Sequence, residues 1–77
     1  MATNSVGIKT DSWTKVNAGA GAVFKQNINK VKVNVGATAP DDTSPYVYWY
    51  DGNFQYDGTD NIYMKSCDED FSVVVIT

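Results

Sequence analysis

The chain has 77 residues, of which 43% are hydrophobic, 13% aromatic and only 19% charged, a composition typical of one folded domain and not of a disordered segment. Six lysines, no arginine and nine acidic residues give a net charge of −3, so the clustered basic residues of a nucleic-acid-binding protein are missing and we predict no nucleic-acid partner. There is no histidine and one cysteine, Cys67, which excludes an internal disulfide and a structural zinc site within one chain.

A domain of this size buries a small core and usually needs an additional source of stability. Because disulfide and zinc are excluded, we predict association with copies of itself or with another protein. No apolar run reaches the ~20 residues that span a membrane, and the first residues do not resemble a signal peptide. We therefore predict no membrane insertion, and the single thiol fits synthesis in a reducing cytoplasm.

The first eleven residues are polar, contain a glycine and show no hydrophobic period. We predict that 1–11 is an extended N-terminal arm, outside a single β-domain spanning 12–77. Its apolar side chains, Val6 and Ile8, are predicted to contact a neighbouring molecule.

Short strand-like runs then follow one another, separated by turn residues. The clearest is 30–35, where Val31, Val33 and Val35 alternate with polar residues and are predicted to face the core. The last run is almost wholly apolar, which predicts a strand covered on both faces, within the molecule or by a partner, and lying between two others, with Val73 and Val75 in the core. The seven predicted strands are 12–17, 22–28, 30–35, 46–50, 54–56, 62–67 and 71–76.

A loop at 36–44 leads into the aromatic run 46–50, and Asp51-Gly52 then gives a strong hairpin signal. We predict that 54–56 is the short return strand of that hairpin. No stretch has a 3.6-residue period, and the strands recur every eight to twelve residues or so. The fold class predicted is all-β, a small antiparallel β-sandwich or barrel of about seven short strands.

Catalytic patterns are missing from the sequence. Without histidine, the Ser-His-Asp and Cys-His arrangements cannot form, and the acidic residues after Cys67 would raise a thiol's pKa instead of activating it. Asp51, Asp57 and Asp60 could in principle supply paired carboxylates, but each stands in a turn that explains it without chemistry. We predict no enzymatic activity and no cofactor.

Calcium was a second possibility, because 51–53 and 57–61 are rich in side-chain oxygens. The EF-hand pattern fails when counted from Asp51, since its sixth position is Tyr56 instead of glycine and its twelfth is Ile62 instead of glutamate. Turn chemistry is the preferred interpretation, and no metal site is predicted.

The aromatic run carries the main candidate surface. In a strand, Tyr46, Tyr48 and Tyr50 share one face, while Val47 and Trp49 share the other. One row can fill the core of a small sheet, and the other must be covered or face water. Three interpretations stay open for these aromatic rows: core and rim, a protein interface, or a platform for a carbohydrate.

Several segments resemble a group of small phage virion proteins. They are Ser12-Trp13-Thr14-Lys15-Val16, Val23-Phe24-Lys25-Gln26-Asn27-Ile28, the alternating 31–35 with its Gly36-x-x-Ala39-Pro40 exit, 58–66, and Val73-Val74-Val75-Ile76. The resemblance covers 12–77 and implies a structural component of a phage particle, on the capsid or on the tail.

We therefore predict a non-enzymatic phage structural protein, made in the host cytoplasm and present in the virion, that decorates or reinforces a capsid, with capsid or tail proteins as partners and as a homo-oligomer. The predicted interface residues are Val6, Ile8, Tyr46, Tyr48 and Tyr50. The alternatives are a tail-associated accessory protein, a small module that binds a carbohydrate or receptor through 46–50, and a small regulatory protein that binds a host or phage protein.

Overall fold

A computed structural model describes residues 2–17, 22–26, 30–50 and 52–77. Within these ranges the chain forms eight strands and no helix: β1 (Thr3–Ile8), β2 (Thr14–Asn17), β3 (Ala22–Gln26), β4 (Val31–Gly36), β5 (Val47–Trp49), β6 (Gly52–Tyr56), β7 (Asn61–Ser66) and β8 (Phe71–Ile76). No helix long and apolar enough to cross a membrane is found in them.

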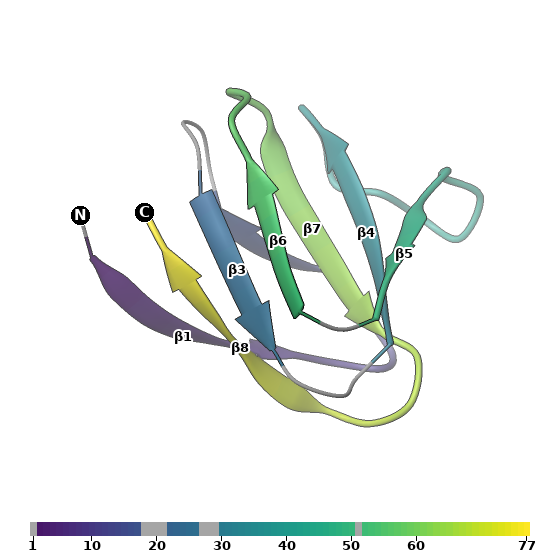
Figure 1. Cartoon of the computed structure of the whole chain (residues 1–77). Helices are drawn as coiled ribbons and strands as arrows, with labels where there is room; N and C mark the ends of the chain where they lie inside the picture. The colour runs from purple at the N-terminus through teal and green to yellow at the C-terminus, as the bar shows by residue number, and fades with distance from the viewer. Residues whose placement is uncertain (1, 18–21, 27–29, 51) are drawn as a thin grey trace.

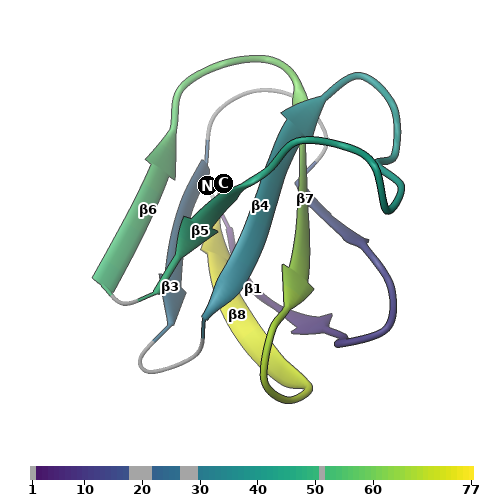
Figure 2. The ribbon, with the colours of Figure 1, turned by 90° about the vertical axis from the view of Figure 1, so that its right-hand side faces the viewer.

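The strands form two four-stranded antiparallel sheets that pack face to face (Figures 1 and 2). Sheet A has the order β1-β8-β3-β6, and sheet B has the order β2-β7-β4-β5. The predicted all-β sandwich is confirmed, and β8 lies between β1 and β3 as expected for the terminal apolar run. Only β4 and β5 are consecutive strands that pair with each other, so nearly all pairing is between residues distant in the sequence.

The core fills the space between the sheets, and it is built by the alternation that the sequence displays. Val31 and Val33 on β4 and Val73 and Val75 on β8 are buried, as predicted. The largest fully buried side chains come from both sheets: Phe24, Ile8, Ile62, Met64, Val31, Val33 and Val73.

One part of the valine pattern was predicted wrongly. Val35 is 41% exposed because β5 pairs with β4 only as far as Val33, so the end of β4 has no flanking strand on that side. Val74 is 39% exposed, so one face of β8 is uncovered within a single chain, and its coverage by a partner stays a prediction.

The N-terminal segment is part of the sandwich instead of an arm outside it. β1 pairs with β8 along its whole length, from Thr3 opposite Ile76 to Ile8 opposite Phe71. Ile8 is fully buried and Val6 packs against the core, so Ile8 is a core residue and not the exposed contact that was predicted. The strand showed no period because only two residues of β1, Val6 and Ile8, are apolar.

The predicted hairpin between 46–50 and 54–56 does not form. β5 pairs with β4 in sheet B, whereas β6 pairs with β3 in sheet A, so the chain passes from one sheet to the other after Trp49. Gly52 has a φ of 81°, a left-handed conformation that glycine adopts at little cost. The Asp-Gly signal therefore marked a sharp change of direction but not a strand pairing; Asp51 itself, like residues 27 and 28 of the predicted second run, lies outside the described residues.

Candidate functional site

The exposed hydrophobic side chains gather at one place. Of the six large hydrophobic side chains that are exposed in the described residues, five lie at the end of β4 and around β5; we call them the β5 patch: Val35, Tyr46, Val47, Tyr48 and Tyr50. Scattered apolar residues on a surface are normal, but five of six at one end of a sheet favour a contact surface there. Tyr48 and the two valines lie on different faces of sheet B, because Val35 and Val47 continue the rows of Val33 and Trp49.

The sheet register determines which row of the aromatic run faces outward. Trp49 lies opposite Val31 and is buried, so the neighbouring Tyr48 must point to the other face, where it lies opposite Lys32. Trp49 also contacts Phe54 across the sandwich, with ring centroids 5.6 Å apart. The buried indole thus anchors β5 and presents Tyr48 to solvent.

The loop between β4 and β5 folds back over the outer face of sheet B (Figure 2). The Asn34 side-chain amide donates to the Pro45 carbonyl at 2.9 Å, and Lys65 on β7 lies 3.9 Å from the Asp42 carboxylate. At the end of the loop the ring of Tyr46 contacts that of Trp13, with centroids 6.5 Å apart. These contacts place Tyr46 on the sheet surface beside Tyr48.

The turn of this loop is built around Asp41. Its carboxylate accepts hydrogen bonds from the Thr43 hydroxyl at 2.7 Å and the Thr43 amide at 2.8 Å, and the Ser44 amide donates to the Asp41 carbonyl. The Thr43 side-chain and backbone bonds hold the pKa of Asp41 below its usual value of 3.8. The loop that carries Tyr46 therefore has its own hydrogen-bonded frame.

The two tyrosines and two lysines form one cluster. The rings of Tyr46 and Tyr48 meet edge to face at 5.2 Å, and their hydroxyls lie 3.2 Å apart. Lys30 Nζ lies 4.2 Å from the centroid of the Tyr48 ring, and Lys32 Nζ lies 4.8 Å from that of Tyr46. The hydrogen bond with Tyr46 is the main cause that raises the pKa of Tyr48 above its usual value of 10.0, so the Tyr48 hydroxyl stays protonated at neutral pH.

Charge is distributed unevenly around this cluster. The chain is acidic overall, yet neither Lys30 nor Lys32 has a carboxylate within ion-pair distance in the described part of the chain. A cation over an aromatic ring contributes ~0.5–1 kcal/mol at exposed sites, which holds both ammonium groups beside the rings. The result is an aromatic surface with a local positive charge.

The structure brings together three of the five predicted interface residues. Tyr46, Tyr48 and Tyr50 all belong to the β5 patch, whereas Val6 and Ile8 lie on β1 in the other sheet. Lys30 and Lys32 were not predicted to belong to the site, because their position over the rings depends on the pairing of β4 with β5. Val35 was missed because its row was predicted to face the core, and Val47 because the sequence left open which row of 46–50 is buried.

The other candidate groups are dispersed. Asp57 accepts a hydrogen bond from the Gln55 side chain, and the amide of Asp60 donates to the Tyr56 hydroxyl, so both belong to a turn. Cys67 is exposed after β7, and its amide donates to the Lys30 carbonyl. Within the described ranges no three His, Cys, Asp or Glu residues are grouped so that they could hold a metal ion.

Comparison with known proteins returned no matching family model, curated protein or solved structure.

Proposed function

We propose that this chain is a non-enzymatic structural protein of a phage particle, which decorates or reinforces the capsid through the β5 patch. The observation that carries the proposal is the gathering of exposed aromatic and aliphatic side chains on β5 and the end of β4. The resemblance of 12–77 to small phage virion proteins supports the phage assignment. The proposed location is the virion, after synthesis in the host cytoplasm.

The composition of the patch favours a protein partner. Tyrosine is enriched where interfaces are strongest, because its ring supplies a large apolar area and its hydroxyl can still form a hydrogen bond. Tyr46 and Tyr48 support each other edge to face, so they lose little side-chain freedom on binding. Lys30 and Lys32 add positive charge, and we therefore expect an acidic, partly apolar surface on the capsid protein.

The test begins with purified particles of the phage whose genome encodes the chain. Mass spectrometry of the particles should detect the chain, and purified protein should cosediment with particles from which it has been stripped. Tyr48→Ala should weaken that binding by about 30-fold, the effect of a residue that contributes ~2 kcal/mol at the centre of an interface. Particles that lack the chain would refute the virion assignment.

The matched control is Val74→Ala. Val74 is the one exposed large hydrophobic side chain outside the β5 patch among the described residues, and it lies on the opposite sheet. Its truncation removes a similar kind of surface, so we expect unchanged cosedimentation. Equal binding by Tyr48→Ala and the wild type would show that the β5 patch is not the contact surface.

A tail location is the same proposal with a different partner, and cosedimentation with separated heads and tails distinguishes the two.

A carbohydrate platform is a second candidate, favoured by the exposure of Tyr50 at 61%. A sugar stacks on an open ring face, however, and a lysine already lies over one face of Tyr46 and of Tyr48. Binding on a glycan array that Tyr48→Ala abolishes would favour the sugar.

A further inference from the structure

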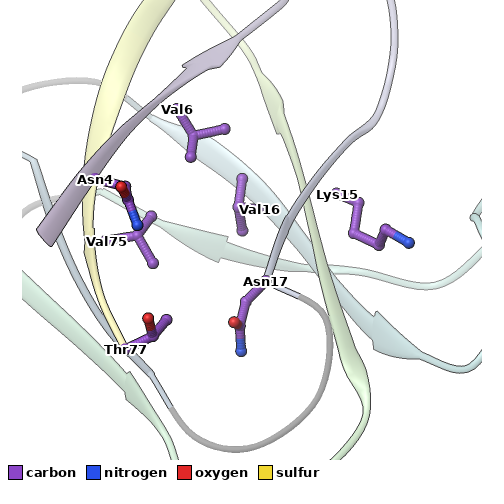
Figure 3. Close-up of a pocket in the computed structure, with 7 residues that line it drawn as sticks. All are labelled: Asn4, Val6, Lys15, Val16, Asn17, Val75 and Thr77. Carbon is purple, nitrogen blue, oxygen red and sulfur yellow. The ribbon is translucent and has the colours of Figure 1, made fainter. Parts of the chain in front are cut away.

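The sandwich has two sides at which the edge strands of sheets A and B lie next to each other, and these two sides differ. Beside β5 and β6 the gap between the sheets is filled by rings, since Phe54 lies 5.6 Å from Trp49 and 5.7 Å from Phe24. Beside β1 and β2 there is a cavity of about 340 Å³, which we call the β1–β2 groove. Figure 3 shows Val6 and Val16 facing each other across it from the two sheets.

The groove has an apolar floor and a polar rim. Its floor is formed by Val6, Val16 and Val75, and its rim by Asn4, Lys15, Asn17 and Thr77. In Figure 3 the valines converge on the space between β1 and β2, and Lys15 lies to one side of them. An added strand that continued sheet A beyond β1 would cover this groove with its inward-facing side chains.

The free edge of β1 offers the hydrogen-bonding groups that such a strand needs. The Ala2 amide donates to the Thr77 carbonyl at 2.8 Å, and the Thr77 amide donates to the Ala2 carbonyl at 2.9 Å. Along an antiparallel ladder such hydrogen-bonded pairs alternate with pairs that exchange no hydrogen bonds. The ladder with β8 continues without a register shift. The N–H and C=O groups of Thr3, Ser5 and Gly7 therefore point away from β8, and no described residue bonds to them.

β1 also lacks the features by which edge strands avoid pairing with other chains, namely charged residues, proline and bulges. Its sequence is TNSVGI, six residues without any of these. In sheet B the edge strand β2 carries Lys15 and a register shift, and the other edge, β5, is only three residues long. The remaining edge, β6, lies where rings already fill the gap.

We propose that a second copy of this chain occupies this edge, with the two β1 strands paired antiparallel about a two-fold axis at Ser5. The residues whose backbone groups point away from β8, Thr3, Ser5 and Gly7, are evenly spaced about Ser5. The N–H and C=O of Ser5 can therefore form two hydrogen bonds with the C=O and N–H of the partner's Ser5. In the same register Thr3 pairs with the partner's Gly7 and Asn4 lies beside the partner's Val6. The two copies of sheet A become one continuous sheet, and each Val6 lies over the mouth of the other copy's groove.

A second copy fits this edge because two identical strands bring like residues close together, and β1 has no charged residue that would repel its copy. The inference develops the association with copies of itself that the sequence predicts, and it does not depend on the partner of the β5 patch. A six-residue pairing buries a modest area, so we expect a dissociation constant in roughly the micromolar range.

The test is sedimentation equilibrium of the full chain over about a thousandfold range of concentration. The wild type should pass from monomer to dimer. Ser5→Pro removes an N–H that β8 does not use, and proline is tolerated on edge strands, so the fold should persist while dimerisation weakens by more than about tenfold. Ser5→Ala keeps the N–H and is the matched control, with dimerisation unchanged.

A second measurement keeps the inference testable if Ser5→Pro fails to fold. Directly opposed residues in such a pair have Cα atoms ~5.5 Å apart, within the range that a disulfide spans. Ser5→Cys with Cys67→Ser should give an oxidised covalent dimer, whereas Thr10→Cys with Cys67→Ser should not.

Two results would overturn this inference: a wild type that stays monomeric at every concentration, and a dimer that Ser5→Pro leaves intact. Either failure is distinguishable from a failure of the proposed function, since Tyr48→Ala tests particle binding and should leave the dimer unchanged.

Discussion

Replacing Ile8 by alanine tests whether the N-terminal segment is part of the fold. The Ile8 side chain is fully buried between the sheets and lies opposite Phe71 on β8. Truncating a buried isoleucine costs ~2–5 kcal/mol, because transfer energy is lost and a cavity remains. The total stability of a domain of this size is roughly 4–12 kcal/mol. We therefore expect Ile8→Ala to remove a large part of the free energy of unfolding.

Urea denaturation followed by tryptophan fluorescence measures this loss. The midpoint should fall while the m-value stays the same, since the surface exposed on unfolding hardly changes. Val74→Ala removes the same kind of branched side chain from an exposed position of sheet A and should cost less than about 1 kcal/mol. Both variants are compared at two protein concentrations, because dimerisation adds to apparent stability. If Ile8→Ala cost no more than Val74→Ala, β1 would not be a structural strand.

Gly58→Ala is expected to lower the melting temperature, because a Cβ at Gly58 would overlap the ring of Tyr56, and such overpacking costs ~1–3 kcal/mol. Gly7→Ala meets nothing within 4 Å and is its control; equal melting of the two variants would contradict the reasoning. The raised pKa of Tyr48 means that its hydrogen bond with Tyr46 stabilises the fold below pH ~10 and is lost as pH rises through the folded pKa. Tyr46→Phe should lower the Tyr48 pKa in a carbon-13 NMR titration, and an unchanged value would show that this bond is not the cause.

Period-2 alternation located part of the core. In β4 every second residue is a valine, and Val31 and Val33 are buried between the sheets. In β8 the prediction that Val73 and Val75 are buried came from the apolar run and not from alternation. Alternation says nothing, however, about where a neighbouring strand ends. Val35 continues the same row and is exposed, because whether a side chain is covered depends on the strand beside it.

β1 was not predicted as a strand, for a physical reason. An edge strand buries little, and the outward row of this one is Thr3, Ser5 and Gly7, which has no hydrophobic signal. Its two apolar residues, Val6 and Ile8, are enough to fix it to the core but too few to show a period. Turn chemistry had a similar limit, since Asp51-Gly52 is compatible with a hairpin and also with a change of sheet.

The tyrosine row could be found from sequence because three aromatic residues at alternate positions exceed what one small core can use. The lysines over the rings could not, since Lys30 and Lys32 reach Tyr48 and Tyr46 only through the β4–β5 pairing and the loop that precedes β5. Composition suggested the residue types of the proposed interface, and tertiary pairing determined which of them lie together.

The sandwich is closed on one side by rings and open on the other, and this asymmetry connects the fold to its proposed assembly. At β5 and β6 the rings of Trp49, which is buried, and Phe54 close the core. The tyrosines remain exposed, where we propose that a partner binds. At β1 and β2 valines form only the floor of the gap, its rim is polar, and the adjoining edge has backbone groups that no described residue bonds to. Without a disulfide, a chain this small gains stability most directly by covering that gap with another copy of the same edge. One side would then hold the copies together while the other remains available to bind the particle.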